Sequence, residues 1–310
     1  MTNSILKRFG SSRIVYIILA ALVIIASILS ETFLNPNNIE NLMRQVVGLG
    51  FVSIGQTLTI LTAGIDLSVG SVVSMASTLT SGLIDGRDAY VFPVIALIIA
   101  LALVIGFLNG VIIVKTRVHP LIVTLGMMSA VQGLLLLYTK QPIGSVPISF
   151  DFLAWGKVWI IPFPIILLAI VAAAGIIFLR KTVIGRYVYA TGGNEEAARL
   201  SGINTNKVKI LIYMLCSCTA ALTGIFLASR MGMGEPLVGE RYMLDSIIPV
   251  LIGGTALTGG KGGIGSTIAG VFIFIILNNV LNLLEVSSYW QLIVKGAIII
   301  ISVALYTKKE

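Results

Sequence analysis

Residues that carry most enzymatic chemistry are scarce in this chain. Its 310 residues include one histidine, His119, and two cysteines, Cys216 and Cys218, and only 11% of them are charged. A single histidine leaves little basis for a histidine metal site or a catalytic triad. The cysteines stand two apart in one apolar run and so face different sides of a helix, which predicts neither a disulfide framework nor a metal site. We therefore expect no metal and no enzymatic activity.

Nucleotide-binding motifs are also missing in usable form. No Gly-x-x-x-x-Gly-Lys-Ser/Thr sequence occurs, since Lys261 is followed by glycine and Thr255 stands six positions before it. This excludes a Walker-type ATP site. Gly260-x-Gly262-x-x-Gly265 matches a dinucleotide fingerprint formally, but apolar runs flank it where a strand and a helix of a soluble domain are required. It is interpreted as a tight loop, and we expect the chain to bind no cofactor.

Apolar residues, by contrast, are abundant. They make up 57% of the chain, and the mean hydropathy is +1.02, so lipid is the expected solvent. The apolar runs are continuous and do not alternate, which favours helices over a barrel. They fall at about 14–30, 46–64, 67–84, 92–114, 120–138, 160–179, 208–228, 246–258, 264–284 and 290–306. We predict an all-α integral membrane protein of about ten transmembrane helices, forming a single domain over residues 1–310.

The distribution of basic residues predicts the orientation. Ten spans place both termini on one side, and alternating the sides gives that side fourteen of the 21 basic residues and the other side six. The fourteen are Lys7, Arg8, Arg13, Lys115, Arg117, Arg180, Lys181, Arg186, Arg199, Lys207, Lys209, Lys261, Lys308 and Lys309. By the positive-inside rule both termini are cytoplasmic, including an N-terminal segment at 1–13. The net charge of +8 is thus scattered between spans, and no nucleic acid partner is expected.

The longest cytoplasmic stretch, residues 180–207, has room for a folded element. Asn194 is a good N-cap, Glu195 and Glu196 suit a first turn, Glu195 can pair with Arg199, and Gly202 is a natural end. These residues predict a short capped helix at about 195–201. On this evidence alone an ordinary surface helix is an equally good interpretation.

Two segments interrupt the apolar pattern with small and polar residues, at 61–70 and 253–263. Their glycines would allow close backbone approach or bending: Gly64, Gly70, Gly253, Gly254, Gly259 and Gly260. Asp66 is expected near the cytoplasmic end of its span. There it either caps the following helix or, with Ser68, lines a translocation path or gate.

Amides inside a predicted span are the remaining polar signal. Asn278 and Asn282 share a helix face at a spacing of four. Such amides either hydrogen-bond to a neighbouring helix or line an aqueous path. A sugar presents hydroxyls that need neutral donors and acceptors, so both residues are candidates for a path lining.

Four motifs together resemble a known family. They are GIDLSVG at 64–70, TGGNEEAARLSGI at 191–203, GGTALTGGKG at 253–262, and NN with VSSY between 278 and 289. They are similar to the permease subunits of the ribose, xylose and galactoside class of ABC importers, nearest in pattern to its ribose members. The resemblance runs through nearly the whole chain from about residue 44.

The resemblance implies a type II-like importer permease of the bacterial inner membrane. Its expected partners are a second permease copy, a cytoplasmic ATPase with two nucleotide-binding domains that uses ATP and Mg, and a periplasmic or lipid-anchored sugar-binding protein. It implies that the coupling helix spans Asn194, Glu195, Glu196, Ala197, Ala198, Arg199, Leu200, Ser201 and Gly202. Alternating access would follow ATP binding in the partner.

Other solutes and other classes of protein stay open. Members of the family handle autoinducer-2 or branched-chain amino acids, and no motif is specific for one sugar. A secondary transporter or channel would need ionisable or unwound sites at the membrane midplane, of which the sequence shows few.

Overall fold

The computed structural model describes residues 2–287, 289–293 and 296–297, with side chains from residue 14 onward. The helices and strands, in chain order, are α1 (Thr2–Leu29), α2 (Pro36–Leu61), α3 (Val69–Ile84), η1 (Asp88–Tyr90), α4 (Val91–Thr116), α5 (Pro120–Tyr138), α6 (Ile148–Trp155), β1 (Lys157–Val158), β2 (Ile161–Pro162), α7 (Phe163–Lys181), α8 (Val183–Gly193), α9 (Glu195–Leu200), α10 (Thr205–Met231), α11 (Glu240–Asp245), α12 (Ile247–Ile252) and α13 (Ile264–Leu283). The predicted helical fold is confirmed, and the one described sheet is the antiparallel β1–β2 hairpin.

Five of the described helices are long and apolar enough to cross a membrane: Asp88–Thr116, α5, α7, α10 and α13. Ile14–Leu29 and α3 are shorter apolar helices. The 26-residue α2 is not among the five, because Arg44, Gln45 and Gln56 lower its hydropathy. The predicted span at 290–306 lies largely outside the described residues. The expectation of about ten spans therefore stays a prediction.

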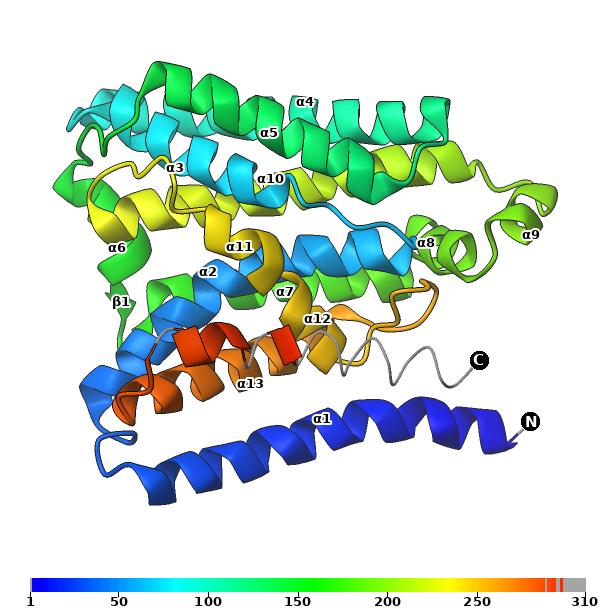
Figure 1. The fold of residues 1–310 in the computed structure, drawn as a ribbon, viewed down its shortest axis with the longest axis horizontal. Helices are drawn as coiled ribbons and strands as arrows, with labels where there is room; N and C mark the ends of the chain where they lie inside the picture. The colour runs from blue at the N-terminus through cyan, green and yellow to red at the C-terminus, as the bar shows by residue number, and fades with distance from the viewer. Residues whose placement is uncertain (1, 288, 294–295, 298–310) are drawn as a thin grey trace.

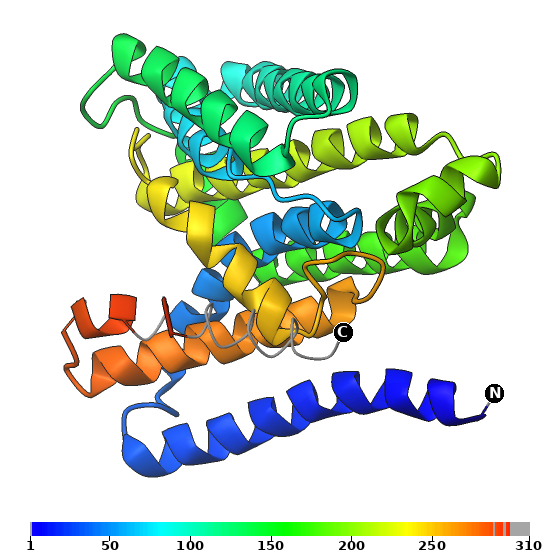
Figure 2. The same cartoon turned by 45° about the vertical axis from the view of Figure 1, so that its right-hand side comes forward.

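Helix α10 is the centre of the bundle. It packs against α2, α3 and α4, while α7 covers another side of α2, and α13 lies between α2 and α1 (Figures 1 and 2). Close approach depends on small residues: a Cβ added to Gly106 of α4 would lie 2.4 Å from the carbonyl oxygen of Tyr213 in α10. Residues Val46 to Leu61 of α2 are all buried, so α2 is a core helix of the bundle.

The predicted span at 246–258 is not one helix. Within it the structure has only the six-residue helix α12, which follows α11 and is succeeded by turns through residues 253–263, so this predicted crossing is broken. Pro249 interrupts the helical hydrogen-bond ladder, and Gly254 adopts φ +82°, so the helix stops before it spans. Helix α3 is continuous over nearly all of the predicted span at 67–84, and the non-helical residues 62–68 link it to α2.

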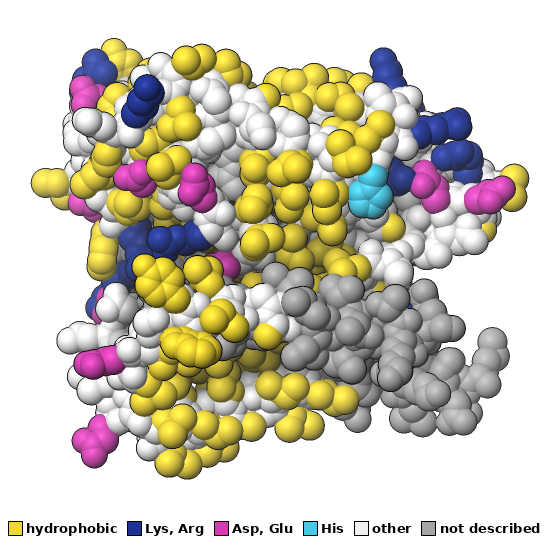
Figure 3. Space-filling view, in the orientation of Figure 1, with side chains coloured by type: hydrophobic (Ala, Val, Ile, Leu, Met, Phe, Trp, Pro, Cys, Tyr) yellow, Lys and Arg dark blue, Asp and Glu magenta, His cyan; other side chains and the backbone are white. Residues whose placement is uncertain are grey.

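Basic side chains lie toward both ends of the long axis of the molecule. Hydrophobic side chains cover much of the middle of the face in Figure 3, while Lys and Arg lie toward both ends, including the end that carries α9. Helix α6 and the hairpin lie at the opposite end (Figure 1). Residues 2–13, expected as a separate cytoplasmic segment, continue α1 as one helix.

Candidate functional site

Helix α9 forms where the sequence predicts it. The Asn194 side chain accepts a hydrogen bond from the Ala197 N–H at 2.9 Å, and Glu195 pairs with Arg199 at 3.2 Å. Gly202 ends the turn with φ +84°. The predicted cap, ion pair and terminating glycine are thus confirmed. Leu200 is 85% exposed at the tip.

The other predicted coupling residues differ in exposure. Asn194, Glu196, Ala197, Arg199, Ser201 and Gly202 face solvent, whereas Ala198 is buried and Glu195 is partly covered. The helix therefore offers one apolar side chain, Leu200, amid polar and small neighbours. Such a surface can enter a groove of another protein without a large apolar patch standing exposed.

Glu195 has a second partner that the sequence did not suggest. Its Oε2 accepts from Lys209 Nζ at 2.6 Å, which ties α9 to the N-terminal part of α10. Burial alone would raise the pKa of Glu195, but the hydrogen bond from Lys209, the charge of Lys209 and the charge of Arg199 together hold that pKa below its ordinary value. Lys209 lies fourteen residues away, so only the folded turn brings the pair together.

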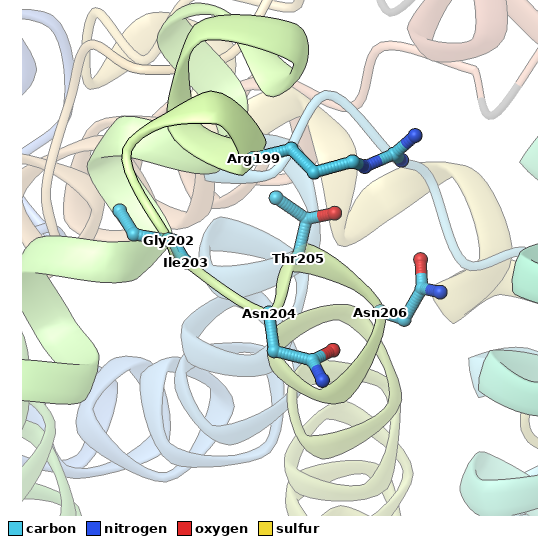
Figure 4. Close-up of a pocket in the computed structure, with 6 residues that line it drawn as sticks. All are labelled: Arg199, Gly202, Ile203, Asn204, Thr205 and Asn206. Atoms are coloured by element: carbon cyan, nitrogen blue, oxygen red, sulfur yellow. The ribbon is translucent and has the colours of Figure 1, made fainter.

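A pocket of about 330 Å³ lies beside this turn (Figure 4). Its lining residues are Arg199, Gly202, Ile203, Asn204, Thr205 and Asn206. The Arg199 and Thr205 side chains extend side by side across the turn in Figure 4. The lining is polar and open to the α9 end of the molecule, as a surface for a partner protein would be.

The end of α8 touches both glycine-rich segments. The Gly260 N–H donates to the Leu61 carbonyl at 3.0 Å, and a Cβ added to Gly192 would lie 1.8 Å from that same carbonyl oxygen. Gly260 has φ +68°, and its own Cβ would lie 2.7 Å from the Cα of Gly193. We call this contact of Leu61, Gly192, Gly193 and Gly260 the glycine junction. It places the end of α8, just before α9, directly against the end of α2 and the turns that follow α12.

The six predicted flexible glycines fall into two groups. Gly254, Gly259 and Gly260 have positive φ, which favours glycine. Gly64, Gly70 and Gly253 have ordinary φ and instead allow close packing against Tyr213, Gly239 and Ser266. Flexibility at these positions stays a prediction.

Asp66 and Ser68 lie inside the helix bundle. Asp66 has no exposed surface, and its Oδ1 accepts from the Ser68 N–H at 2.9 Å and from the Ser68 hydroxyl at 2.6 Å. Asn109 Nδ2 of α4 donates to the Ser68 oxygen at 2.8 Å, and the Leu67 N–H donates to Thr124 of α5 at 3.1 Å. Ser68, and not Asp66, occupies the N-cap position of α3. The pair thus fixes the non-helical link to α4 and α5.

The predicted amide face of α13 is divided. Asn278 is half-buried, and exposed Asn282 accepts from Gln291 Nε2 at 2.8 Å. No hydrogen bond among the described residues joins either asparagine to Asp66 or Ser68. The neighbouring Asn279 forms a reciprocal amide pair with Asn38 of α2, at 2.8 and 3.1 Å. Sequence spacing did not identify this pair, because its members lie 241 residues apart.

Within the part of the chain that the structure describes, no group of three histidine, cysteine, aspartate or glutamate side chains could hold a metal ion. The arrangement combines an exposed polar helix α9, the glycine junction behind it, and the buried polar link between α2 and α3.

Comparison with known proteins identifies the family. Residues 38–303 match the family described as branched-chain amino acid transport system / permease component. The chain is 44% identical over 295 residues to the ribose import permease protein RbsC of Bacillus subtilis strain 168, covering 93% of this chain and 90% of that protein. It is 41% identical over 299 residues to RbsC of Escherichia coli strain K12, covering 95% and 93%.

A further relative is named for a different sugar. The galactose/methyl galactoside import permease protein MglC of Escherichia coli strain K12 is 35% identical over 315 residues, covering 95% of this chain and 94% of that protein. No solved structure matches. Together with the five membrane-capable helices, the near full-length matches show that this multi-pass membrane protein belongs to the permease family of binding-protein-dependent ABC importers that includes these ribose and galactoside permeases.

Proposed function

We propose that this chain is the transmembrane permease subunit of an ABC importer that carries a monosaccharide, a ribose-like pentose or related sugar, across the bacterial inner membrane. The observation that carries the proposal is its near full-length similarity to ribose import permeases of two bacteria. The xylose and D-allose permeases among its relatives also act on sugars by name.

Energy would come from a separate ATPase. This chain lacks a Walker sequence, so ATP and Mg would bind to the partner. Helix α9 supports the proposal, because it projects at one end and exposes Leu200 and Glu196 while Glu195 is held by Lys209. In this mechanism the exposed side chains contact the ATPase, and Glu195 fixes the helix to α10.

The motion would be alternating access in a pair of permease copies. A displacement of α9 would reach α10 through the Glu195–Lys209 contact. It would reach α2 and the turns after α12 through the glycine junction. The non-helical segments before α3 and after α12 would change shape in this motion. A periplasmic or lipid-anchored binding protein would deliver the sugar on the far side.

The candidate path residues remain Asp66, Ser68, Asn278 and Asn282. Asn278 and Asn282 lie on an accessible part of α13, while Asp66 and Ser68 lie in the interior. A path along α13 would pass Asn278 and Asn282, whereas a gate at Asp66 and Ser68 would act through the contacts of their link with α4 and α5.

A branched-chain amino acid is the second candidate solute, because the matched family bears that description. Uptake of labelled ribose, xylose, galactose and leucine by proteoliposomes that contain the permease, its ATPase and its binding protein tests the choice. The proposal predicts ATP-dependent sugar uptake and loss of uptake with an ATPase lacking its Walker lysine. Leucine uptake alone would refute the sugar assignment, and uptake that survives the inactive ATPase would indicate a secondary transporter.

A further inference from the structure

Two large apolar side chains stand exposed at the β1–β2 turn. Trp159 is 90% exposed and Ile160 is 74% exposed, at the end of the molecule opposite α9 (Figure 1). Trp159 has φ +58°, a region that bulky residues rarely adopt. Such a conformation persists only where the surrounding structure imposes it, and it concentrates at functional sites.

The surrounding structure holds the hairpin from the α2 side. Arg44 of α2 is buried, donates from Nε to the Ala154 carbonyl at 3.1 Å, and places its guanidinium 4.4 Å from the ring centre of Trp155. Arg44 also pairs with Glu40, whose second oxygen accepts from Lys157 Nζ at 2.8 Å. The residues on both sides of Gly156 are therefore fixed to α2.

The β1–β2 hairpin is held from the α7 side as well. The Phe163 N–H donates to the Gly156 carbonyl at 2.9 Å, which closes the base of the hairpin. The Phe152 and Phe163 rings lie 4.9 Å apart between centres. The backbone of the projecting turn is thus held in place by these contacts. Little backbone conformational entropy is therefore lost when Trp159 and Ile160 enter a binding surface.

The exposed apolar surface continues along α7. Val158 and Ile161 are half-exposed on the two strands, and α7 then exposes Ile170 and Ile177, with Ala173 between them at helical spacing. Since α7 is one of the membrane-capable helices, this stripe is suited to face lipid. The hairpin tip lies where that stripe reaches the end of the span.

We propose that Trp159 and Ile160 insert into the lipid headgroup region on the membrane face opposite α9 and anchor the α6–α7 corner of the protein there. Tryptophan is favoured at this depth, because its ring is apolar and its indole N–H needs a polar partner. We favour lipid over a transient protein partner as the molecule that covers Trp159 and Ile160. Lipid would cover these side chains permanently, and the same lipid would surround the exposed stripe of α7. Half-exposed Lys157 adds a positive charge beside the tip, which suits lipid phosphates.

Fluorescence quenching tests the proposal. The chain has three tryptophans, so Trp155→Phe with Trp290→Phe leaves Trp159 alone. In phosphatidylcholine vesicles whose acyl chains carry bromine close to the headgroup, its emission should fall to roughly half or less, as expected for an interfacial indole, and aqueous iodide should have little effect.

Iodide quenching without bromine quenching would overturn the proposal, since Trp159 would then face water. Protection from both quenchers would also overturn it, because a protein surface would then cover the tip. Should loss of Trp155 disturb the fold, the difference in emission between the unaltered chain and Trp159→Phe gives the same measurement. The result does not depend on which solute is transported.

Discussion

Lys209 Nζ lies 2.6 Å from Glu195 Oε2, and this contact joins the predicted coupling helix to the central helix of the bundle. Because α10 packs against α2, α3 and α4, a movement of α9 that is transmitted through Lys209 reaches three other helices directly. Glu195, which the sequence places among the residues facing a partner, therefore has an internal role in the structure.

Removing this contact should uncouple transport. Glu195→Gln or Lys209→Met is expected to leave ATPase binding intact and to lower ATP-driven uptake by roughly tenfold, the size of a typical coupling free energy. Uptake and ATP hydrolysis measured in the same proteoliposomes report the ratio between them. The reversed pair, Glu195→Lys with Lys209→Glu, should restore part of the uptake. Full activity in both single variants would show that the contact is dispensable.

Adjacent glycines at the end of α8 should differ sharply. A Cβ at position 192 would lie 1.8 Å from the Leu61 carbonyl oxygen, whereas one at position 193 meets nothing within 4 Å. Gly192→Ala should therefore destabilise the protein by about 1–3 kcal/mol through overpacking, and Gly193→Ala should change stability by less than about 0.5 kcal/mol. Thermal unfolding in detergent measures both. Equal effects would argue against the glycine junction.

The Asn38–Asn279 pair should act on stability, in contrast to the neighbouring amides. Asn279→Leu removes the donor to Asn38 Oδ1, while Asn38 Nδ2 keeps its bond to the Phe33 carbonyl, and the change should cost about 1–2 kcal/mol. Asn278→Leu with Asn282→Leu should instead lower sugar flux while the protein still assembles. Normal flux in that double variant would assign both residues to packing.

Asp66 should tolerate an amide better than truncation. Asp66→Ala removes the acceptor for both the Ser68 N–H and the Ser68 hydroxyl, at an expected cost of about 1–3 kcal/mol. Asp66→Asn keeps an oxygen at that position and should lose less stability. If the two variants unfold at the same temperature, the hydrogen bonds from Ser68 to residue 66 do not contribute to stability.

Leu200 should matter for binding and not for folding. It is 85% exposed, so Leu200→Asp should leave unfolding unchanged. If Leu200 enters a groove of the ATPase, the charge should weaken association by at least about tenfold. Co-purification of the ATPase measures this, with Ile148→Asp as the matched control, because Ile148 is 89% exposed on α6 at the opposite end of the molecule. Undiminished association would place the docking surface elsewhere.

Local features of the site could be predicted from sequence, and long-range ones could not. The cap at Asn194, the Glu195–Arg199 pair and the stop at Gly202 depend on residues within one turn, so their spacing was sufficient. Lys209 and the Asn38–Asn279 pair depend on tertiary packing and leave no periodic signal.

The broken crossing shows a limit of hydropathy. Residues 246–258 are apolar enough to suggest a span, but Pro249 and the glycines after it prevent one continuous helix. Asp66 illustrates the same point, since a non-helical link carries it into the protein interior, where its side chain bonds to Ser68.

The central claim is that a separate ATPase drives sugar import through this permease. Ribose accumulation against a gradient, measured in proteoliposomes with and without the ATPase and the binding protein, tests it most directly. Accumulation should require all three proteins and ATP. Uphill accumulation by the permease alone would contradict the account.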